Sequence, residues 1–169
     1  DLVQAIGCKR GEKFNSKDIR YEKIIIMTDA DVDGAHISTL LMAFFYKEFP
    51  RLIDEGHLYL SVPPLYRITK GSKILYAVND KHKDEIIKKE FKGSEVNINR
   101  FKGLGEMMPA QLKETTMSPD NRTLLKVQIA SKDKKSTLKS VDALMGKKPE
   151  LRFKFIVENS KKISAESIL

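Results

Sequence analysis

Residues 23–36 read KIIIMTDADVDGAH, and the pattern changes twice within this stretch. The first part, residues 23–28, is a β-branched apolar run too short for a helix, which predicts a strand buried on both faces of a parallel sheet. From residue 35 to about residue 49, apolar side chains recur close to positions i, i+3, i+4 and i+7, which predicts an amphipathic helix. An acidic turn at residues 29–34 joins the two, so the stretch predicts half of a βαβ unit.

Three aspartates, Asp29, Asp31 and Asp33, stand at alternate positions of the acidic turn. Like charges within about 4–6 Å repel and raise each other's pKa, and a divalent cation removes that cost. Carboxylate oxygens suit magnesium, calcium or manganese better than zinc, and the sequence has no competing His/Cys cluster. The turn lies where a strand ends and a helix begins, a place where α/β sheets bind ligands and phosphates. We therefore predict a site for a metal and a phosphate.

Two other interpretations fit the same turn. In the first, Asp33 caps the helix, Gly34 relieves the turn, and the remaining aspartates are solvated loop residues. In the second, D-x-D-x-D-G begins a calcium-binding EF-hand loop. That loop needs a bidentate glutamate at position 12, but counting from Asp29 the residue is Leu40, in the apolar stripe of the helix. The EF-hand is therefore disfavoured, whereas the capping interpretation stays open.

The rest of the chain alternates between predicted strands and helices. We expect strands at 57–62, 96–100 and 124–130, a hairpin over 65–69 and 73–78, and helices at 79–91, 109–117, 136–146 and from 149 onward. Residues 152–157 also fit a strand. Such alternation indicates an α/β or α+β architecture.

The composition of the chain limits which class of protein it can belong to. With 169 residues, of which 41% are hydrophobic, the chain can bury a core, and its formal charge of +8 favours acidic partners such as nucleic acid. A single cysteine, Cys8, excludes a disulfide framework within the chain. No run reaches the roughly 18 apolar residues of a membrane span, so we expect a cytoplasmic location without a membrane partner. Because the chain starts at Asp1 and not at methionine, we expect a piece of a longer protein.

A second glycine-containing segment, KGLGE at residues 102–106, could bring backbone close to a phosphate. It lacks the G-x-x-x-x-G-K-[ST] pattern of a nucleotide-binding loop, so the residues alone favour a flexible turn. His36 directly follows the acidic turn and could face the same ligand. Lysine and arginine are dense after residue 120, which suits either a DNA-facing surface or an ordinary solvated one.

Three segments together resemble a known family. They are IIIMTDADVDGAHISTLL at 24–41, PPLYRI at 63–68, and RFKGLGEM with QLKETTM between 100 and 117. They resemble the C-terminal part of the B subunit of bacterial type IIA DNA topoisomerases, and the match runs essentially from end to end. The phenylalanine before KGLGEM and the short span from 91 to 100, without an inserted domain, resemble topoisomerase IV more than gyrase.

The resemblance implies a Toprim fold, an α/β fold with a small parallel sheet flanked by helices, here N-terminally truncated. Residues 1–100 would form the truncated core with a hairpin extension, and residues 101–169 an α+β tail that completes it. By the same resemblance, Asp29 and Asp31 would hold magnesium directly, with manganese or calcium as substitutes. Asp33 would be a third acidic member of that metal site.

The resemblance also implies a mechanism and partners. Lys102, Gly103 and His36 would lie near the DNA, and a tyrosine of the A subunit would attack the scissile phosphate. The metal would stabilise the departing 3′ oxygen, so no residue of this chain need be the nucleophile. Two A and two B subunits would form an ATP-dependent heterotetramer, at the bacterial nucleoid, that relaxes or decatenates DNA. Alternatives are a fragment of the gyrase B subunit, which would serve negative supercoiling, and a non-catalytic module that binds metal or nucleic acid.

One departure from the family pattern affects the expected activity. The family's Toprim domain begins with a strand followed by E-G-D-S-A, whose glutamate is a metal ligand and the proposed acid–base group, and this sequence contains no such motif. The ATPase region with its nucleotide pocket is absent as well, so ATP would bind only to the full-length protein. We therefore predict that the chain alone binds magnesium weakly and does not cleave DNA.

Overall fold

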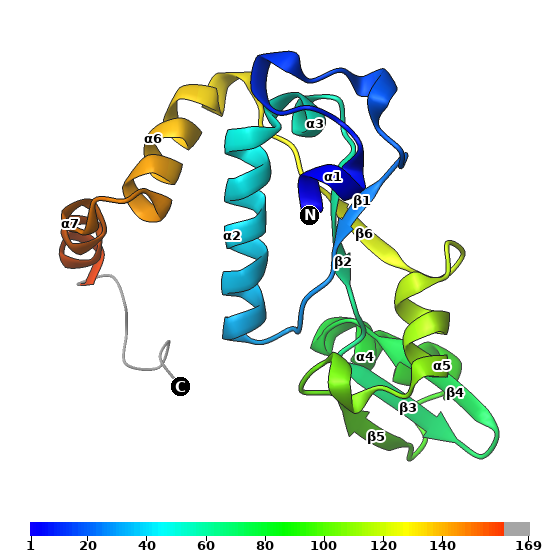
Figure 1. The fold of residues 1–169 in the computed structure, drawn as a ribbon. Helices are drawn as coiled ribbons and strands as arrows, with labels where there is room; N and C mark the ends of the chain where they lie inside the picture. Colours follow the sequence, from blue (N-terminus) through cyan, green and yellow to red (C-terminus); the bar gives the residue numbers. More distant parts are fainter. Residues whose placement is uncertain (161–169) are drawn as a thin grey trace. The chain divides into compact units, whose positions relative to one another are not determined.

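The acidic turn lies in the first of two units into which the chain divides. A computed structural model describes residues 1–160, with a first unit of residues 1–127 and a second unit that begins at Gln128 (Figure 1). The sequence-based division at residue 100 stays a prediction. No helix in the part of the chain that the structure describes is long and apolar enough to cross a membrane.

A three-stranded sheet carries the acidic turn. Its order is β1 (Ile24–Ile26), β2 (Leu58–Val62) and β6 (Thr123–Lys126), with β1 parallel and β6 antiparallel to β2. The predicted strands are present, but β6 ends earlier than expected and makes the sheet mixed. The prediction that the first strand is buried on both faces is wrong, because Ile24 and Ile25 are only partly buried and Ile26 alone is buried.

The helix that follows the turn is α2 (Val32–Glu48), and it runs beside the first sheet (Figure 1). It begins three residues earlier than predicted. Phe49 ends α2 and precedes the short helix α3 (Pro50–Asp54), whose first position holds a proline that cannot donate a backbone hydrogen bond. Phe49 also packs edge-on or tilted against the rings of Phe14, Phe44 and Phe45. This aromatic cluster anchors the carboxyl end of α2.

A second sheet of the first unit consists of β4 (Lys73–Ala77), β3 (Tyr66–Lys70) and β5 (Asn97–Arg100) in that order, all antiparallel. The predicted hairpin is therefore confirmed, and its turn uses Gly71 at φ 57°. Helix α4 (Asp80–Glu90) is capped by Asn79, whose side chain accepts a hydrogen bond from the His82 backbone N–H. Tyr66, Ile68, Ala77 and Phe91 form the core between sheet and helix.

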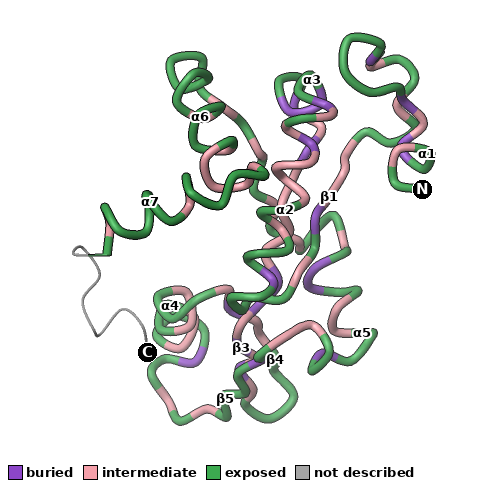
Figure 2. The backbone as a smooth tube through the Cα atoms, turned by 60° about the vertical axis from the view of Figure 1, so that its left-hand side comes forward, coloured by how far each residue is buried: buried purple, intermediate pink, exposed green. Residues whose placement is uncertain are grey.

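The remaining helices are shorter or more exposed. Helix α1 spans Leu2–Ile6, and α5 (Pro109–Leu112) continues into a π-helical turn, η4 (Lys113–Met117). In the second unit, α6 covers Lys134–Met145 and α7 covers Pro149–Ser160, so the alternative of a strand at 152–157 is wrong. Helix α6 begins two residues earlier than predicted, so Ser136 lies inside it, and its hydroxyl donates to the Asp133 carbonyl. No residue from 128 to 160 is buried (Figure 2).

An ion pair at the start of α4 makes the stability of the second sheet depend on pH. Asp80 accepts hydrogen bonds from Lys83 at 2.8 Å and from the hydroxyl of buried Tyr66 at 2.8 Å. The Lys83 ammonium first, and the Tyr66 hydroxyl second, lower the pKa of Asp80. A carboxyl with a lowered pKa in the folded state stabilises the fold above its unfolded pKa of about 3.9, and this stabilisation is lost as pH falls further.

We expect Asp80→Asn to lower the free energy of unfolding at pH 6 and to lower it less near pH 2.5, because protonation of Asp80 weakens its hydrogen bond to Lys83 as pH falls. The measurement is urea unfolding followed by circular dichroism at both pH values. Glu85→Gln, which changes an exposed carboxylate of the same helix, is the matched control and should leave the pH dependence as it is. An unchanged pH dependence in Asp80→Asn would contradict the prediction.

Candidate functional site

The start of α2 determines how the acidic turn is folded. Asp31 is the N-cap of the helix, and its Oδ1 accepts a hydrogen bond from the Gly34 N–H at 2.7 Å. Asp33 lies in the first turn of the helix, where a carboxylate is favoured by the positive end of the helix dipole. The capping interpretation therefore chose the wrong residue, since Asp31 and not Asp33 makes the cap.

Gly34 allows the turn to fold back tightly over the start of α2. A Cβ atom at this position would overlap the carbonyl oxygen of Asp29 and would lie 2.9 Å from its backbone nitrogen. Both of these atoms belong to the backbone, which cannot rotate away as a side chain can. The close approach holds the backbone of Asp29 against the first turn of α2, and it requires a residue without a side chain.

The KGLG segment contacts the acidic turn directly. The Leu104 N–H donates a hydrogen bond of 2.6 Å to Oδ1 of Asp29, although the two residues are 75 positions apart. A Cβ atom on Gly103 would lie 3.1 Å from both Cγ and Oδ1 of Asp29, so glycine lets the loop approach the carboxylate. The Lys102 N–H donates to Glu106 at 2.8 Å, which closes the loop on itself. Nothing in the sequence pattern predicts this contact.

A cavity of about 250 Å³ opens beside the turn, between α2 and β2. Its polar lining consists of Thr28, Asp29, Asp31, Ser38 and Ser61. The hydroxyl oxygen of Ser61 is buried and has no hydrogen-bond partner among the residues that the structure describes. The sequence pattern does not identify Thr28, Ser38 and Ser61, because single hydroxyl residues on a strand or helix give no functional signal before the packing is known.

The structure brings some of the predicted site residues together and leaves others apart. Asp29 and Asp31 line one cavity, and Gly103 lies against Asp29. Asp33, His36 and Lys102 are exposed and do not line that cavity. Within residues 1–160, no group of three His, Cys, Asp or Glu side chains is placed to hold a metal ion. The metal-binding role of the three aspartates therefore stays a prediction.

The two carboxylates in the cavity nevertheless have the chemistry that magnesium requires. Asp29 and Asp31 each use Oδ1 to accept one backbone hydrogen bond, and no described residue donates to Oδ2 of either. Magnesium at phosphate-processing sites is usually held by one or two carboxylates, with phosphate oxygens and water completing its coordination. A pair of oriented carboxylates beside hydroxyl groups fits this pattern as a partial site that a phosphate would complete.

The contact between loop and turn can be tested by itself. In Gly103→Ala, the new methyl group should displace the Asp29 carboxylate and break its hydrogen bond to the Leu104 N–H. Hydrogen bonds to charged groups contribute about 1.5–3 kcal/mol, so the Leu104 amide should exchange with solvent about tenfold faster or more in hydrogen-exchange NMR. Gly105→Ala is the matched control, because a Cβ there meets no atom within 4 Å. Unchanged protection of Leu104 would show that the loop accommodates the methyl group.

Two family models match the chain. The model described as "Toprim domain" matches residues 4–63, and the model described as "DNA gyrase B subunit, carboxyl terminus" matches residues 93–157. Asp29 lies in the first matched region and Leu104 in the second, so their hydrogen bond joins the two. Together with the observed architecture, the first match confirms the α/β Toprim fold that the sequence resemblance implied.

Curated relatives cover nearly the whole chain. The B subunit of DNA topoisomerase 4 from Bartonella bacilliformis is 58% identical over 95% of this chain and 23% of its own length. The protein of the same name from Caulobacter vibrioides is 55% identical over 98% of this chain and 24% of its own length. The B subunit of DNA gyrase from Clostridium acetobutylicum is 48% identical over 96% of this chain and 25% of its own length. The chain thus spans about a quarter of the length of these relatives.

Proposed function

Because this chain belongs to the family of bacterial type IIA topoisomerase B subunits, we propose that it forms part of the DNA cleavage and religation centre of such an enzyme. The observation that carries the proposal is the position of Asp29. Its carboxylate accepts a hydrogen bond from the Leu104 N–H, and Asp29 lines the same cavity as the capping residue Asp31 and three hydroxyl residues. Such an arrangement suits a metal that bridges protein and phosphate.

Each residue of the site has a specific task in this proposal. Asp29 and Asp31 would hold magnesium through their free carboxylate oxygens. Asp33, the second residue of α2, would add negative charge nearby. When bound, the ion supplies positive charge that stabilises the departing 3′ oxygen of the DNA. The nucleophile would be a tyrosine of the A subunit, so this chain positions the phosphate and does not form the covalent bond.

Residues around the carboxylates would face the DNA. Lys102 is exposed next to Gly103, whose missing side chain lets the loop lie against Asp29. A lysine ammonium at that position would pair with a backbone phosphate, which fixes DNA without reading its sequence. His36, exposed on the first turns of α2, would lie beside the same strand of DNA. The net charge of +8 supports binding to a polyanion.

We further propose that the full-length protein is part of topoisomerase IV and not of gyrase. The two relatives named for topoisomerase 4 are 58% and 55% identical to this chain, whereas the gyrase relative is 48% identical. Its partners would then be DNA and the A subunit, in an assembly of two A and two B subunits. The reaction would be ATP-dependent relaxation and decatenation, with ATP bound outside these 169 residues.

The proposed function is tested by replacing the corresponding segment of a complete B subunit with residues 1–169 and pairing it with the A subunit. Asp29→Ala and Asp31→Ala should each lower the rate of magnesium-dependent supercoil relaxation at least tenfold, because each removes an oxygen ligand. Glu85→Ala removes a carboxylate far from the turn in sequence and should retain activity. Full activity in both aspartate variants would end the proposal and leave a module that binds only nucleic acid.

Calorimetry on the isolated chain provides a second measurement. Since only two carboxylates line the cavity, we expect magnesium to bind with a dissociation constant on the order of millimolar or weaker, well above that of closed oxygen cages. Tight binding would show that the isolated chain holds a more complete metal site than this geometry provides.

A further inference from the structure

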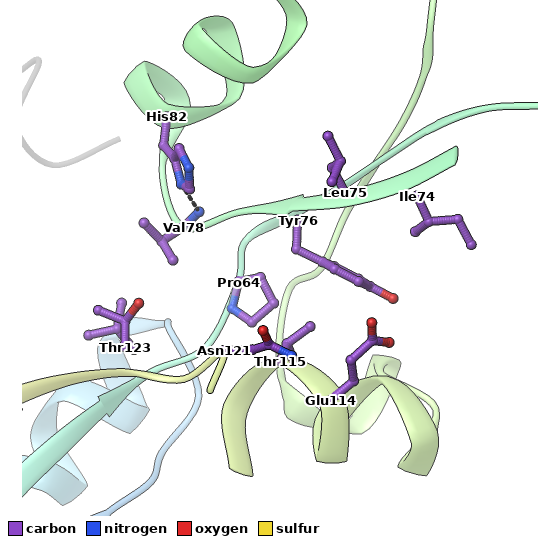
Figure 3. Close-up of a pocket in the computed structure, with 11 residues that line it drawn as sticks. Pro64, Ile74, Leu75, Tyr76, Val78, His82, Glu114, Thr115, Asn121 and Thr123 are labelled. Atoms are coloured by element: carbon purple, nitrogen blue, oxygen red, sulfur yellow. Dashed lines mark hydrogen bonds between the residues drawn. The ribbon is translucent and has the colours of Figure 1, made fainter. Parts of the chain in front are cut away.

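The first unit contains a second cavity, of about 260 Å³, between strand β4 and the π-helical turn η4 (Figure 3). It is distinct from the cavity at the acidic turn, although Val62 and Val78 line both. Its volume is below the roughly 300–1,000 Å³ of sites for drug-sized ligands, so it suits a single side chain better than a nucleotide. The function proposed above makes no use of this cavity.

The charge of the lining points to a cationic occupant. None of the eleven lining residues is lysine or arginine, although these make up 31 of the 169 residues of the chain. Glu114 is the one carboxylate in the lining, and it forms no ion pair with any residue between 1 and 160. The Nδ1 of His82, which also lines the cavity, accepts a hydrogen bond from the Val78 N–H at 3.4 Å.

The walls combine an aromatic ring with apolar side chains. Tyr76 extends from β4 toward Glu114, which points back from η4, and Pro64 lies between the two walls (Figure 3). Ile74 and Val78 add apolar surface on the side of β4. The apolar stem of a lysine or arginine side chain can pack on such surfaces while its charged end stays near the opening of the cavity. An ammonium or guanidinium near both a tyrosine ring and a carboxylate gains from each of them.

The wall formed by η4 has an unusual backbone. Lys113–Met117 forms a π-helical turn, and such turns are rare and frequently occur at functional sites. Thr115 in this turn is buried, and its hydroxyl donates a hydrogen bond of 2.8 Å to the Gln111 carbonyl. Glu114 belongs to this turn, so the turn's backbone determines where its carboxylate lies.

We propose that this cavity binds the side chain of a lysine or arginine from another protein chain. The occupant carries one positive charge at the end of an apolar stem, which matches one carboxylate above apolar walls. A free polyamine fits less well, because it carries several charges whereas the lining offers a single carboxylate and the chain has a net charge of +8. Phosphate groups are disfavoured by the same carboxylate.

The test uses NMR titration of the 169-residue chain with Nα-acetyl-lysine methylamide and Nα-acetyl-arginine methylamide. We expect amide shifts centred on Tyr76, Val78 and Thr115, with dissociation constants on the order of millimolar. The norleucine analogue has the same stem without the charge and should bind at least fivefold more weakly. Spermidine, as the free polyamine, should cause smaller shifts at these amides than the lysine compound at equal concentration.

Two variants test whether the charge of Glu114 provides the binding energy. Glu114→Gln keeps the shape of the side chain, removes its charge, and should raise the dissociation constant of the lysine compound at least fivefold. Glu85→Gln removes an exposed carboxylate of α4 that does not line the cavity, and it should leave binding unchanged. Equal binding of the norleucine analogue, unchanged binding by Glu114→Gln, shifts centred elsewhere, or tighter binding of spermidine would each overturn the proposal.

Discussion

Gly34→Ala is expected to disrupt the acidic turn and to lower magnesium-dependent relaxation by the grafted enzyme about a hundredfold. The added methyl group would overlap the carbonyl oxygen of Asp29, so the turn must open. Opening moves Asp29 and also weakens the cap, because the Gly34 N–H donates to Asp31. Displacing a reacting group by about 1 Å can cost a factor of about 10² in rate. This substitution displaces both carboxylates together.

The same substitution should also destabilise the chain. Overpacking costs about 1–3 kcal/mol and loss of an N-cap about 1 kcal/mol, while the better helix propensity of alanine offsets up to about 1 kcal/mol. We therefore expect the free energy of unfolding, measured with urea, to fall by about 1–3 kcal/mol. Gly105→Ala is the control, since a Cβ there contacts nothing. Wild-type stability and activity in Gly34→Ala would show that the turn tolerates a side chain.

Phe49→Ala is expected to have the largest effect on stability, a loss of about 3–5 kcal/mol. Its side chain is 0% exposed, and its ring centroid lies 5.8 Å from that of Phe44, 6.1 Å from that of Phe45 and 6.4 Å from that of Phe14. These rings come from α2 and from the N-terminal segment. The surroundings cannot easily collapse onto the cavity, because Phe49 also joins α2 to α3.

Urea unfolding of the 169-residue chain measures this loss, which is a large part of the roughly 5–15 kcal/mol by which a typical domain is stable. Phe153→Ala is the matched control, because Phe153 is 69% exposed on α7 and its removal should change stability by no more than about 0.5 kcal/mol. Similar losses in the two variants would contradict the role of Phe49 as the centre of the aromatic cluster.

Much of the local structure could be predicted from sequence. The β-branched run at 24–26 forms a strand, the periodic apolar residues after the turn form α2, and the Lys-Gly-Ser turn forms a hairpin. Each depends on interactions between residues close in sequence. One error occurred where distant segments matter, because burial of β1 depends on what packs against its two faces. The choice of Asp31 over Asp33 as the cap is local, and the error came from starting the helix three residues too late.

The candidate site, too, could be predicted only in part from the sequence. The motif at 29–34 predicted a hard divalent cation at the aspartates, which stays a prediction, and three segments together carried the resemblance to the topoisomerase family, because residue type and spacing hold that information. The pairing of Asp29 with the Leu104 N–H, and the hydroxyl groups beside it, became visible only in the folded chain. Asp29 and Leu104 lie 75 positions apart in the sequence, and the packing of the folded chain brings them together. No local sequence pattern encodes such a contact.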